Sequence, residues 1–236
     1  MHFVDLPIFK RTGGGAMGAR SVWIRGVAGS SPVLPTNFFN HDKTMKTETL
    51  ITERLVLRPV VREDAPMIEK YVSDCRIANK TLLIPHPYPE GAAAIWIDEN
   101  LTKPSPGVLF ALTLKLGGDL VGVMALRVCD DKLRAETGFW LAPLFWGNGL
   151  CTEALQAVVD YGFRELDLQR IYAGHFLENP ASGRVQQKVG MKKEGVLRMG
   201  AFRFGEPKDL VMYAITRPDW EVRSKMKVRS KNLSCV

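Results

Sequence analysis

The stretch FWLAPLFWGNGLCTEAL, residues 139–155, constrains the fold more than any other part of the 236-residue chain. It begins as an apolar strand, breaks at Pro143, passes through Gly147 and Gly149, and continues as a helix. A helix N-terminus has unpaired N–H groups and a partial positive charge, and glycines there let an anion approach the backbone. The pattern therefore indicates either a phosphate site made of backbone amides or a plain helix start.

Two well-known glycine motifs for phosphate binding do not fit this stretch. A P-loop requires a lysine directly after its last glycine, but Leu150 follows Gly149. A dinucleotide fingerprint requires a third glycine where this chain has Thr152. That fingerprint also belongs to the first strand–helix unit of a parallel sheet, whereas an antiparallel meander precedes the stretch here.

Apolar periodicity predicts the other elements. Two alternating runs flank a Gly-Gly-Asp turn at residues 117–119, which predicts a hairpin over residues 107–128. Residues 133–142 form a third strand of the same meander, and a strand–helix–strand crossover to residue 177 follows it. Further strands are expected at 54–60, 193–205 and 207–217, and further helices at 62–72, 92–101 and 180–190.

These elements make one mixed α/β domain over residues 47–220, and the segments on either side of it carry the positive charge. Residues 1–46 have six Lys or Arg and two Asp, and residues 221–236 have five Lys or Arg and one Glu. Each segment is therefore +4, while residues 47–220 sum to −1. Basic terminal segments are typically solvated, so residues 221–236 are expected to be a basic C-terminal tail and nucleic-acid binding is the less favoured alternative.

Residues 1–46 are rich in Gly, Ser and Pro, which predicts a disordered or non-native N-terminal extension. Their basic, acid-poor composition is also that of an organelle transit peptide. Met45 as the natural start is the favoured alternative, because structured sequence follows it directly. No apolar run reaches the ~18 residues of a membrane span, so no membrane partner is expected.

The cysteines show neither disulfide nor metal spacing, which indicates reduced thiols in a cytoplasmic protein and no metal site. Cys151 lies in the first turn of the expected helix, where the helix N-terminus lowers a thiol pKa, but no base is visible beside it. The four cysteines are Cys75, Cys129, Cys151 and Cys235.

The segment AETGFWLAPLFWGNGLCTEAL, followed by LQRIYAGHFLENPASGRVQQKVGMKKEGVLR, resembles the GNAT N-acetyltransferase superfamily. More narrowly, it is similar to the branch with the Rim-type ribosomal-protein N-terminal acetyltransferases, and the similarity extends over residues 50–220. The resemblance implies the GNAT fold, with a mostly antiparallel central sheet, a V-shaped splay and flanking helices. It also implies transfer of an acetyl group from acetyl-CoA to a primary amine.

The resemblance implies a site for acetyl-CoA, with coenzyme A as product, around the glycine turn. In similar enzymes the strand before the turn pairs with the pantetheine arm, and the turn amides bind the pyrophosphate. The Gln or Arg that the family has before the glycines is Leu144 here, so one side-chain contact is missing. The implied cofactor-binding residues are Phe139, Trp140, Leu141, Trp146, Gly147, Asn148, Gly149, Leu150, Cys151, Thr152, Asn179, Ser182, Arg184 and Lys188.

Two residues are candidates for the proton transfers. In similar enzymes a carboxylate at the position of Glu136 relays the amine proton, although an exposed strand residue in an ion pair explains Glu136 equally well. Ser182 is implied as a hydroxyl near the sulfur of coenzyme A, and helix capping is the alternative. The tyrosine that many relatives have one turn later is Gln186 here.

The acceptor is expected to be a primary amine, and the branch resemblance makes a protein N-terminus the first choice. An α-amine with a pKa near ~8 also needs less help from a base than lysine near ~10. Small-molecule amines are the alternative, and a non-catalytic acyl-CoA-binding module is a third. Direct attack on the thioester is expected, since no activated nucleophile is apparent. Either a monomer or a homodimer is compatible with the sequence.

Overall fold

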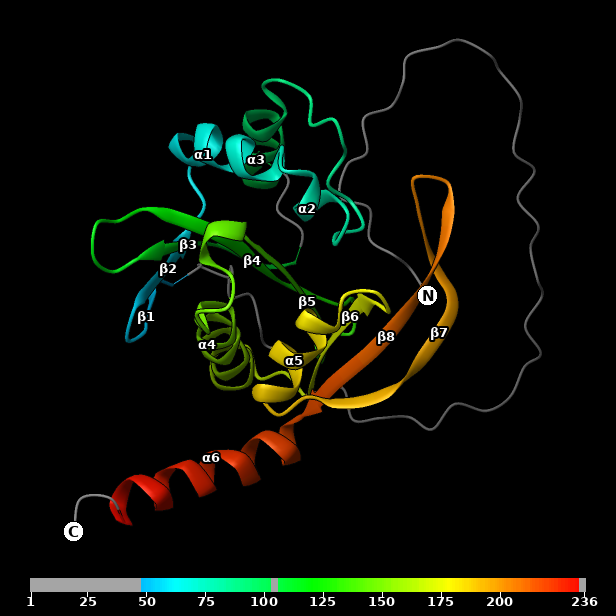
Figure 1. Cartoon of the computed structure of the whole chain (residues 1–236). Coiled ribbons are helices and arrows are strands. Elements are labelled where there is room, and N and C mark those ends of the chain that lie inside the picture. Colours follow the sequence, from blue (N-terminus) through cyan, green and yellow to red (C-terminus); the bar gives the residue numbers. More distant parts are fainter. Residues whose placement is uncertain (1–47, 103–105, 234–236) are drawn as a thin grey trace. The chain divides into compact units, whose positions relative to one another are not determined.

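The structure, a computed structural model, describes residues 48–102 and 106–233, all within the unit Thr47–Val236 (Figure 1). The predicted N-terminal extension, residues 1–46, lies outside the described residues. So does Cys235.

A central sheet of eight strands has the order β1-β2-β3-β4-β5-β6-β8-β7. Neighbouring strands are antiparallel except β5 and β6, which are parallel and are joined by the predicted crossover. This confirms a mixed α/β fold with a mostly antiparallel sheet. The strands are β1 (Leu50–Ile51), β2 (Leu55–Pro59), β3 (Gly107–Leu114), β4 (Leu120–Val128), β5 (Arg134–Leu141), β6 (Arg170–Phe176), β7 (Lys192–Arg203) and β8 (Glu206–Thr216).

Helices cover both faces of the sheet (Figure 1). On one face α1 and α3 bury a cluster that includes Ile68 and Ile97, and on the other α4 buries a larger cluster that includes Leu155 and Val158. None of the helices among the described residues is long and apolar enough to cross a membrane. The helices are α1 (Ala65–Val72), α2 (Cys75–Ala78), α3 (Ala92–Thr102), α4 (Leu150–Arg164), α5 (Pro180–Lys188) and α6 (Arg217–Leu233), with short 3-10 turns at Arg62–Asp64 and Pro143–Phe145.

The parallel strands β5 and β6 pair only at one end. Their register matches Arg134 with Arg170, Ala135 with Ile171 and Glu136 with Tyr172, and it stops there. Beyond that point residues 137–141 pair only with β4, and the rest of β6 pairs only with β8. The two strands therefore diverge, which confirms the V-shaped splay.

The segment expected as a basic tail, residues 221–236, is mostly part of a helix. α6 begins at Arg217, and Trp220 in its first turn stacks on Phe163 with ring centroids 5.3 Å apart. The Trp220 Nε1 atom also donates to Asp160 at 2.6 Å. After Trp220 the sequence has no apolar stripe, so helical periodicity does not reveal the helix. The expected domain end at residue 220 thus falls inside α6.

Two short elements, β1 and α2, were also not expected. They have two and four residues, fewer than a periodic pattern needs in order to be detected. The longer strands and helices lie within a few residues of the expected ranges.

Candidate active site

The turn before α4 has the backbone conformation that its glycines predict. Gly147 and Gly149 have φ of 80° and 76°, in the left-handed region that residues with a Cβ rarely adopt. Gly149 is the N-cap, and its helix receives no hydrogen bond from a capping side chain. A Cβ on Gly147 would meet nothing within 4 Å, so the space in front of this residue is open.

The N–H groups of this turn are free over an unbroken run. Among the described residues, no carbonyl or side chain accepts a hydrogen bond from the backbone N–H of any residue from Gly147 to Thr152. Trp146 before them and Glu153 after them do donate, to Pro143 and Gly149. Six consecutive donors at a helix N-terminus form a site for an anion with several oxygens.

Behind the turn lies a side chain that the sequence did not point to. Arg54, just before β2, donates from Nη1 to the carbonyl of Asn148 at 2.8 Å and from Nε to Glu153 at 2.7 Å. Since a peptide group is planar and trans, holding the Asn148 carbonyl on Arg54 turns the N–H of Gly149 to the opposite side. Arg54 therefore orients one of the six free donors.

The same arginine offsets an acidic charge near the turn. Glu153 lies in the first turn of α4, where a carboxylate would repel a bound phosphate. Burial works against ionisation of Glu153, but hydrogen bonds from Thr52 and Arg54 outweigh it and hold the pKa of Glu153 below its usual value. The ionised Glu153 is thus neutralised by Arg54, with Nη2 and Oε2 2.7 Å apart. These contacts indicate that Glu153 serves the fold rather than the chemistry.

Sequence spacing could not reveal Arg54 because it lies 94 residues before Asn148. The available signal was an exposed arginine at the start of a strand, which is a common pattern. Position 144, where the family has Gln or Arg, is an exposed Leu, as expected. Arg54 brings a positive charge to the same turn from another strand.

Three residues of β5 that were expected to bind the cofactor lie along one edge of the splay. Phe139, Trp140 and Leu141 pair with β4 on one side, and their other backbone edge has no strand partner among the described residues. The Leu141 carbonyl is occupied, since it accepts from Trp146 Nε1 at 2.6 Å. Trp146 is 39% exposed and lies under the Lys80 ammonium, 5.7 Å from the ring centroid. These contacts support the turn without closing the backbone edge of β5.

Cys151 is not an activated thiol. Part of the residue is exposed, but its side chain packs against the buried cluster under α4. This burial raises the pKa of the Cys151 thiol to about 12, the opposite of the shift that a helix N-terminus produces. Desolvation therefore outweighs the helix dipole here. Cys151 and its neighbours Leu150 and Thr152 are placed to offer backbone N–H groups.

The N-terminus of α5 brings Asn179 and Ser182 together. Asn179 is the N-cap residue, but its side chain makes no capping hydrogen bond, so the capping explanation does not hold for it. Ser182 Oγ accepts from Gln186 Nε2 at 3.3 Å, and Gln186 is buried. Gln186 thus occupies the expected tyrosine position and holds the serine hydroxyl.

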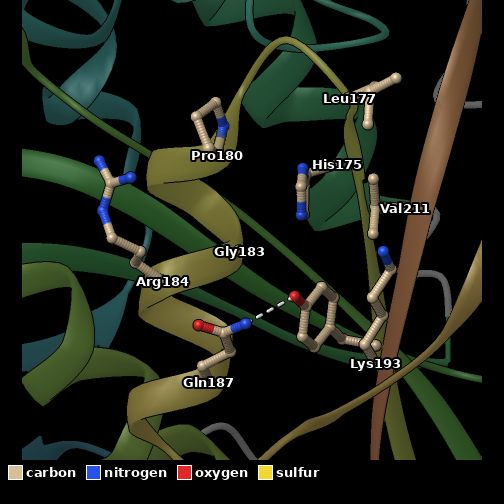
Figure 2. A pocket seen from close by; sticks show the side chains of 9 residues that line it. His175, Leu177, Pro180, Gly183, Arg184, Gln187, Lys193 and Val211 are labelled. Atoms are coloured by element: carbon tan, nitrogen blue, oxygen red, sulfur yellow. Dashed lines mark hydrogen bonds between the residues drawn. The ribbon is translucent and has the colours of Figure 1, made fainter.

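Arg184 and Lys188 lie on the outer side of α5, and both are exposed. A cavity of about 230 Å³ lies between α5 and β8, and Arg184 points away from the buried His175 that lines it (Figure 2). No residue of β5 lines this cavity, so it is not the splay. His175 stacks on Tyr213 at 5.7 Å between ring centroids, as expected of a core imidazole.

Glu136 lies at the last paired position of β5, where the splay begins. Its carboxylate is 3.3 Å from Arg127 Nη2, on the directly opposite residue of β4. The ion pair that was the alternative explanation is therefore present. Glu136 keeps 37% of its side chain exposed, which leaves the carboxylate accessible.

The structure puts the two catalytic candidates on opposite faces of the sheet. Trp140 packs in the α1/α3 cluster and Leu141 in the α4 cluster, so by strand alternation Glu136 points to the α1/α3 face. Ser182 lies on α5, whose Val185 packs against the α4 cluster. The gap between the diverging strands β5 and β6 connects these two faces. Among the described residues, no group of three or more His, Cys, Asp or Glu side chains could hold a metal ion.

Residues 54–192 match the family model of the acetyltransferase (GNAT) domain. The chain belongs to the GNAT family. It is an acyltransferase of the N-acetyltransferase type. The resemblance of residues 50–220 to this superfamily is thereby confirmed.

Two curated relatives and one solved structure are similar to the chain. An uncharacterized N-acetyltransferase, YoaA, of Bacillus subtilis is 33% identical, over 72% of this chain and 97% of its own. The [ribosomal protein uS5]-alanine N-acetyltransferase of Escherichia coli is 28% identical, and the match covers 77% of this chain and 97% of the relative. A solved structure of a RimL ribosomal L7/L12 α-N-protein acetyltransferase in complex with coenzyme A has a TM-score of 0.66, covers 72% and 98%, and is 19% identical, so it shows the fold alone.

Proposed function

We propose that the chain binds acetyl-CoA at the glycine turn and transfers the acetyl group directly to a protein N-terminal α-amine. The run of six free N–H groups from Gly147 to Thr152, beside the splayed strands, carries this proposal. A diphosphate has several oxygens that need donors, and the run supplies them without side chains. The site therefore fits the pyrophosphate of coenzyme A.

The open edge of β5 fits the pantetheine arm. Residues 137–141 have unpaired backbone groups on the side of the splay, and the arm contains amides that can pair with such groups. When bound, acetyl-CoA supplies a thioester whose carbonyl carbon an amine can attack. The arm would run from the α4 turn into the splay, between Phe139 and Ser182.

Glu136 and Ser182 have separate roles in this proposal. The amine nitrogen forms a bond to the acetyl carbon while the carbon–sulfur bond breaks. Glu136 accepts the amine proton, directly or through a water, and passes it to solvent. The Ser182 hydroxyl, held by Gln186, donates a proton to the leaving sulfur and is reprotonated from solvent. Their placement on opposite faces lets the amine enter from one face and the thiol leave on the other.

An α-amine is the proposed acceptor for a chemical reason and a comparative one. Near neutral pH a larger fraction of α-amines than of lysine amines is unprotonated, because their pKa values are near ~8 and ~10. An ion-paired Glu136 is therefore a sufficient base for an α-amine. The E. coli relative is named for acetylation of the alanine of a ribosomal protein, which supports an N-terminal acceptor.

A turnover screen tests this proposal. Purified protein is given acetyl-CoA with N-terminal tripeptides, peptides with an acetylated N-terminus and one free lysine, and polyamines, and the release of free CoA thiol is measured. We expect release with free N-termini and little with the lysine peptides. Release with polyamines alone would replace the acceptor by a small amine. Calorimetric CoA binding without turnover on any amine would indicate a binding module instead.

A further inference from the structure

Arg203, on β7 close to the tip of the β7–β8 hairpin, is buried at 8% exposure. Its guanidinium donates to Ala78 O from Nε at 3.2 Å and from Nη2 at 2.9 Å, and to Leu82 O from Nη1 at 3.0 Å. Nη2 also donates to Ile84 O. One side chain therefore holds three carbonyls of the segment between α2 and α3.

No carboxylate forms an ion pair with Arg203 in the part of the chain that the structure describes. Burial lowers the pKa of Arg203, but a guanidinium remains charged in proteins. The Phe204 ring lies under it, 3.8 Å from Cζ to the centroid. Carbonyl dipoles and this ring thus compensate the charge, and the planar fork sets the relative positions of the groups it contacts.

Apart from the packing of Ile84 and Tyr88 against the α1/α3 cluster, the segment held by Arg203 has few anchors for its backbone. Within the described residues, no backbone N–H from Leu82 to Tyr88 donates to another backbone group. The carbonyls of Leu82 and Ile84 are bonded to Arg203 and to no other backbone group. The hydrogen bonds to these two carbonyls therefore come from the hairpin that carries Arg203.

This segment and the hairpin meet over the end of β6. Phe176, the last residue of β6, packs with Leu210 of β8, Ala201 of β7 and Leu82 of the segment.

The face of the sheet on which this packing occurs follows from alternation along β6. Ile171 and Ala173 face the α4 cluster, so Phe176 and Tyr172 face the other way. That is the face on which Glu136 lies. The open arm of the splay on this face is thus bounded by α1 and α3 on the β5 side and by the Arg203-held segment on the β6 side.

We propose that Arg203 is a positioning residue of the acceptor site. It fixes residues 82–88 as the wall against which the incoming amine's substituents lie, and within the described residues its hydrogen bonds do not include the glycine turn on the opposite face. This inference rests on the proposed function, because it needs an acceptor that approaches on the Glu136 face. It does not depend on whether that acceptor is a peptide or a small amine.

Native-state proteolysis tests the anchoring without any acceptor. Trypsin cleavage after the exposed Lys80 is followed by mass spectrometry in Arg203→Lys and Arg203→Met. A lysine keeps the charge but has no planar fork to span three carbonyls. We expect cleavage at Lys80 at least about fivefold faster in both variants, because local opening governs the rate. Arg198→Met, on the exposed part of the same strand, is the matched control and should cleave like the wild type.

Steady-state kinetics then measure the effect on acceptor binding separately from the effect on acetyl-CoA binding. With the best acceptor from the screen, Arg203→Lys should raise the acceptor KM at least about fivefold and leave the acetyl-CoA KM within about twofold. Lys80 cleavage at the wild-type rate would overturn the proposal, as would an equal rise in both KM values. A screen with no turnover would defeat the proposed function, and the cleavage rates would still decide whether Arg203 holds the wall.

Discussion

Two of the arginines that donate to backbone carbonyls, Arg54 and Arg203, lie on opposite faces of the sheet. Arg54 stands behind the glycine turn on the α4 face, pairs with Glu153, and grips one carbonyl while 46% of its side chain is exposed. Arg203 on the α1/α3 face is 8% exposed, has no carboxylate partner among the described residues, and grips three carbonyls. The first supports a turn that has its own helix, whereas the second supports a segment that has no regular structure.

The proposed function gives a reason for this difference. A diphosphate can be held by N–H groups at a helix N-terminus, so the α4 face needs only backbone in the correct conformation and one charge behind it. The proposed acceptor wall has no helix N-terminus to supply a regular set of backbone groups. Residues 82–88 form neither helix nor strand, and their position comes from side-chain packing and from the hydrogen bonds of Arg203. The proposed cofactor face therefore depends mainly on local backbone conformation, and the proposed acceptor face on long-range contacts.

The largest expected difference between substitutions at Arg203 and at Arg54 is in the free energy of unfolding. Arg203→Met leaves the Leu82 and Ile84 carbonyls without a donor, while the Ala78 carbonyl keeps the N–H and hydroxyl of Thr81. Each unsatisfied group costs about 1–3 kcal/mol, so we expect a loss of about 3 kcal/mol. Arg54→Met removes a half-exposed ion pair and should cost about 1 kcal/mol. Urea denaturation of both variants measures the difference. Equal losses would mean that the two arginines do the same structural work.

The next largest effect concerns the chemistry at the mouth of the splay. Glu136→Gln removes the proposed proton acceptor and should lower kcat at least about tenfold, which is about 1.4 kcal/mol of barrier. Glu194→Gln is the matched control, because Glu194 is also a strand carboxylate in an ion pair, with Arg170, and is 42% exposed against 37% for Glu136. Its kcat should stay within about twofold. A similar loss in both variants would show that Glu136 acts only through its ion pair.

The glycine turn gives a smaller and more selective effect. Gly147→Ala and Gly118→Ala both place a Cβ at positive φ, 80° and 73°, with nothing within 4 Å. Each should lose about 1 kcal/mol of stability, because the left-handed conformation is unfavourable for alanine. Only Gly147→Ala should also weaken CoA binding, by about tenfold, since relaxation of the turn moves its free N–H groups. Calorimetric titration with CoA measures this, and unchanged affinity in Gly147→Ala would contradict the backbone site.

The conformation of the glycine turn was largely predictable from the sequence because its information is local. The strand, Gly147, Gly149 and the helix that follows lie within about 17 residues, and positive φ at glycine is the physical reason for the pattern. The alternation of β5 and the parallel crossover also follow from short-range periodicity. What local patterns could not show is Arg54, whose partner Asn148 lies 94 residues away.

The acceptor face was much less predictable for the same reason. The sequence around Arg203, FRFG, reads as a strand end, and nothing in it indicates that the guanidinium turns inward to carbonyls more than a hundred residues earlier. The helix α6 escaped prediction because its contacts through Trp220 involve one apolar residue rather than a stripe. A single side chain that contributes through tertiary contacts leaves no period to detect.

The smallest expected effect is at Cys151, and it tests whether the cofactor face contributes a nucleophile. Burial disfavours the thiolate and raises the pKa to about 12, so at pH 9 only about one Cys151 in a thousand is ionised. Iodoacetamide should therefore label Cys151 far more slowly than the exposed Cys75, as peptide mass spectrometry can measure. Incubation with acetyl-CoA and no amine should leave the intact mass unchanged. An acetyl group on Cys151 would replace direct transfer by a two-step route, and the α4 face would then supply chemistry as well as binding.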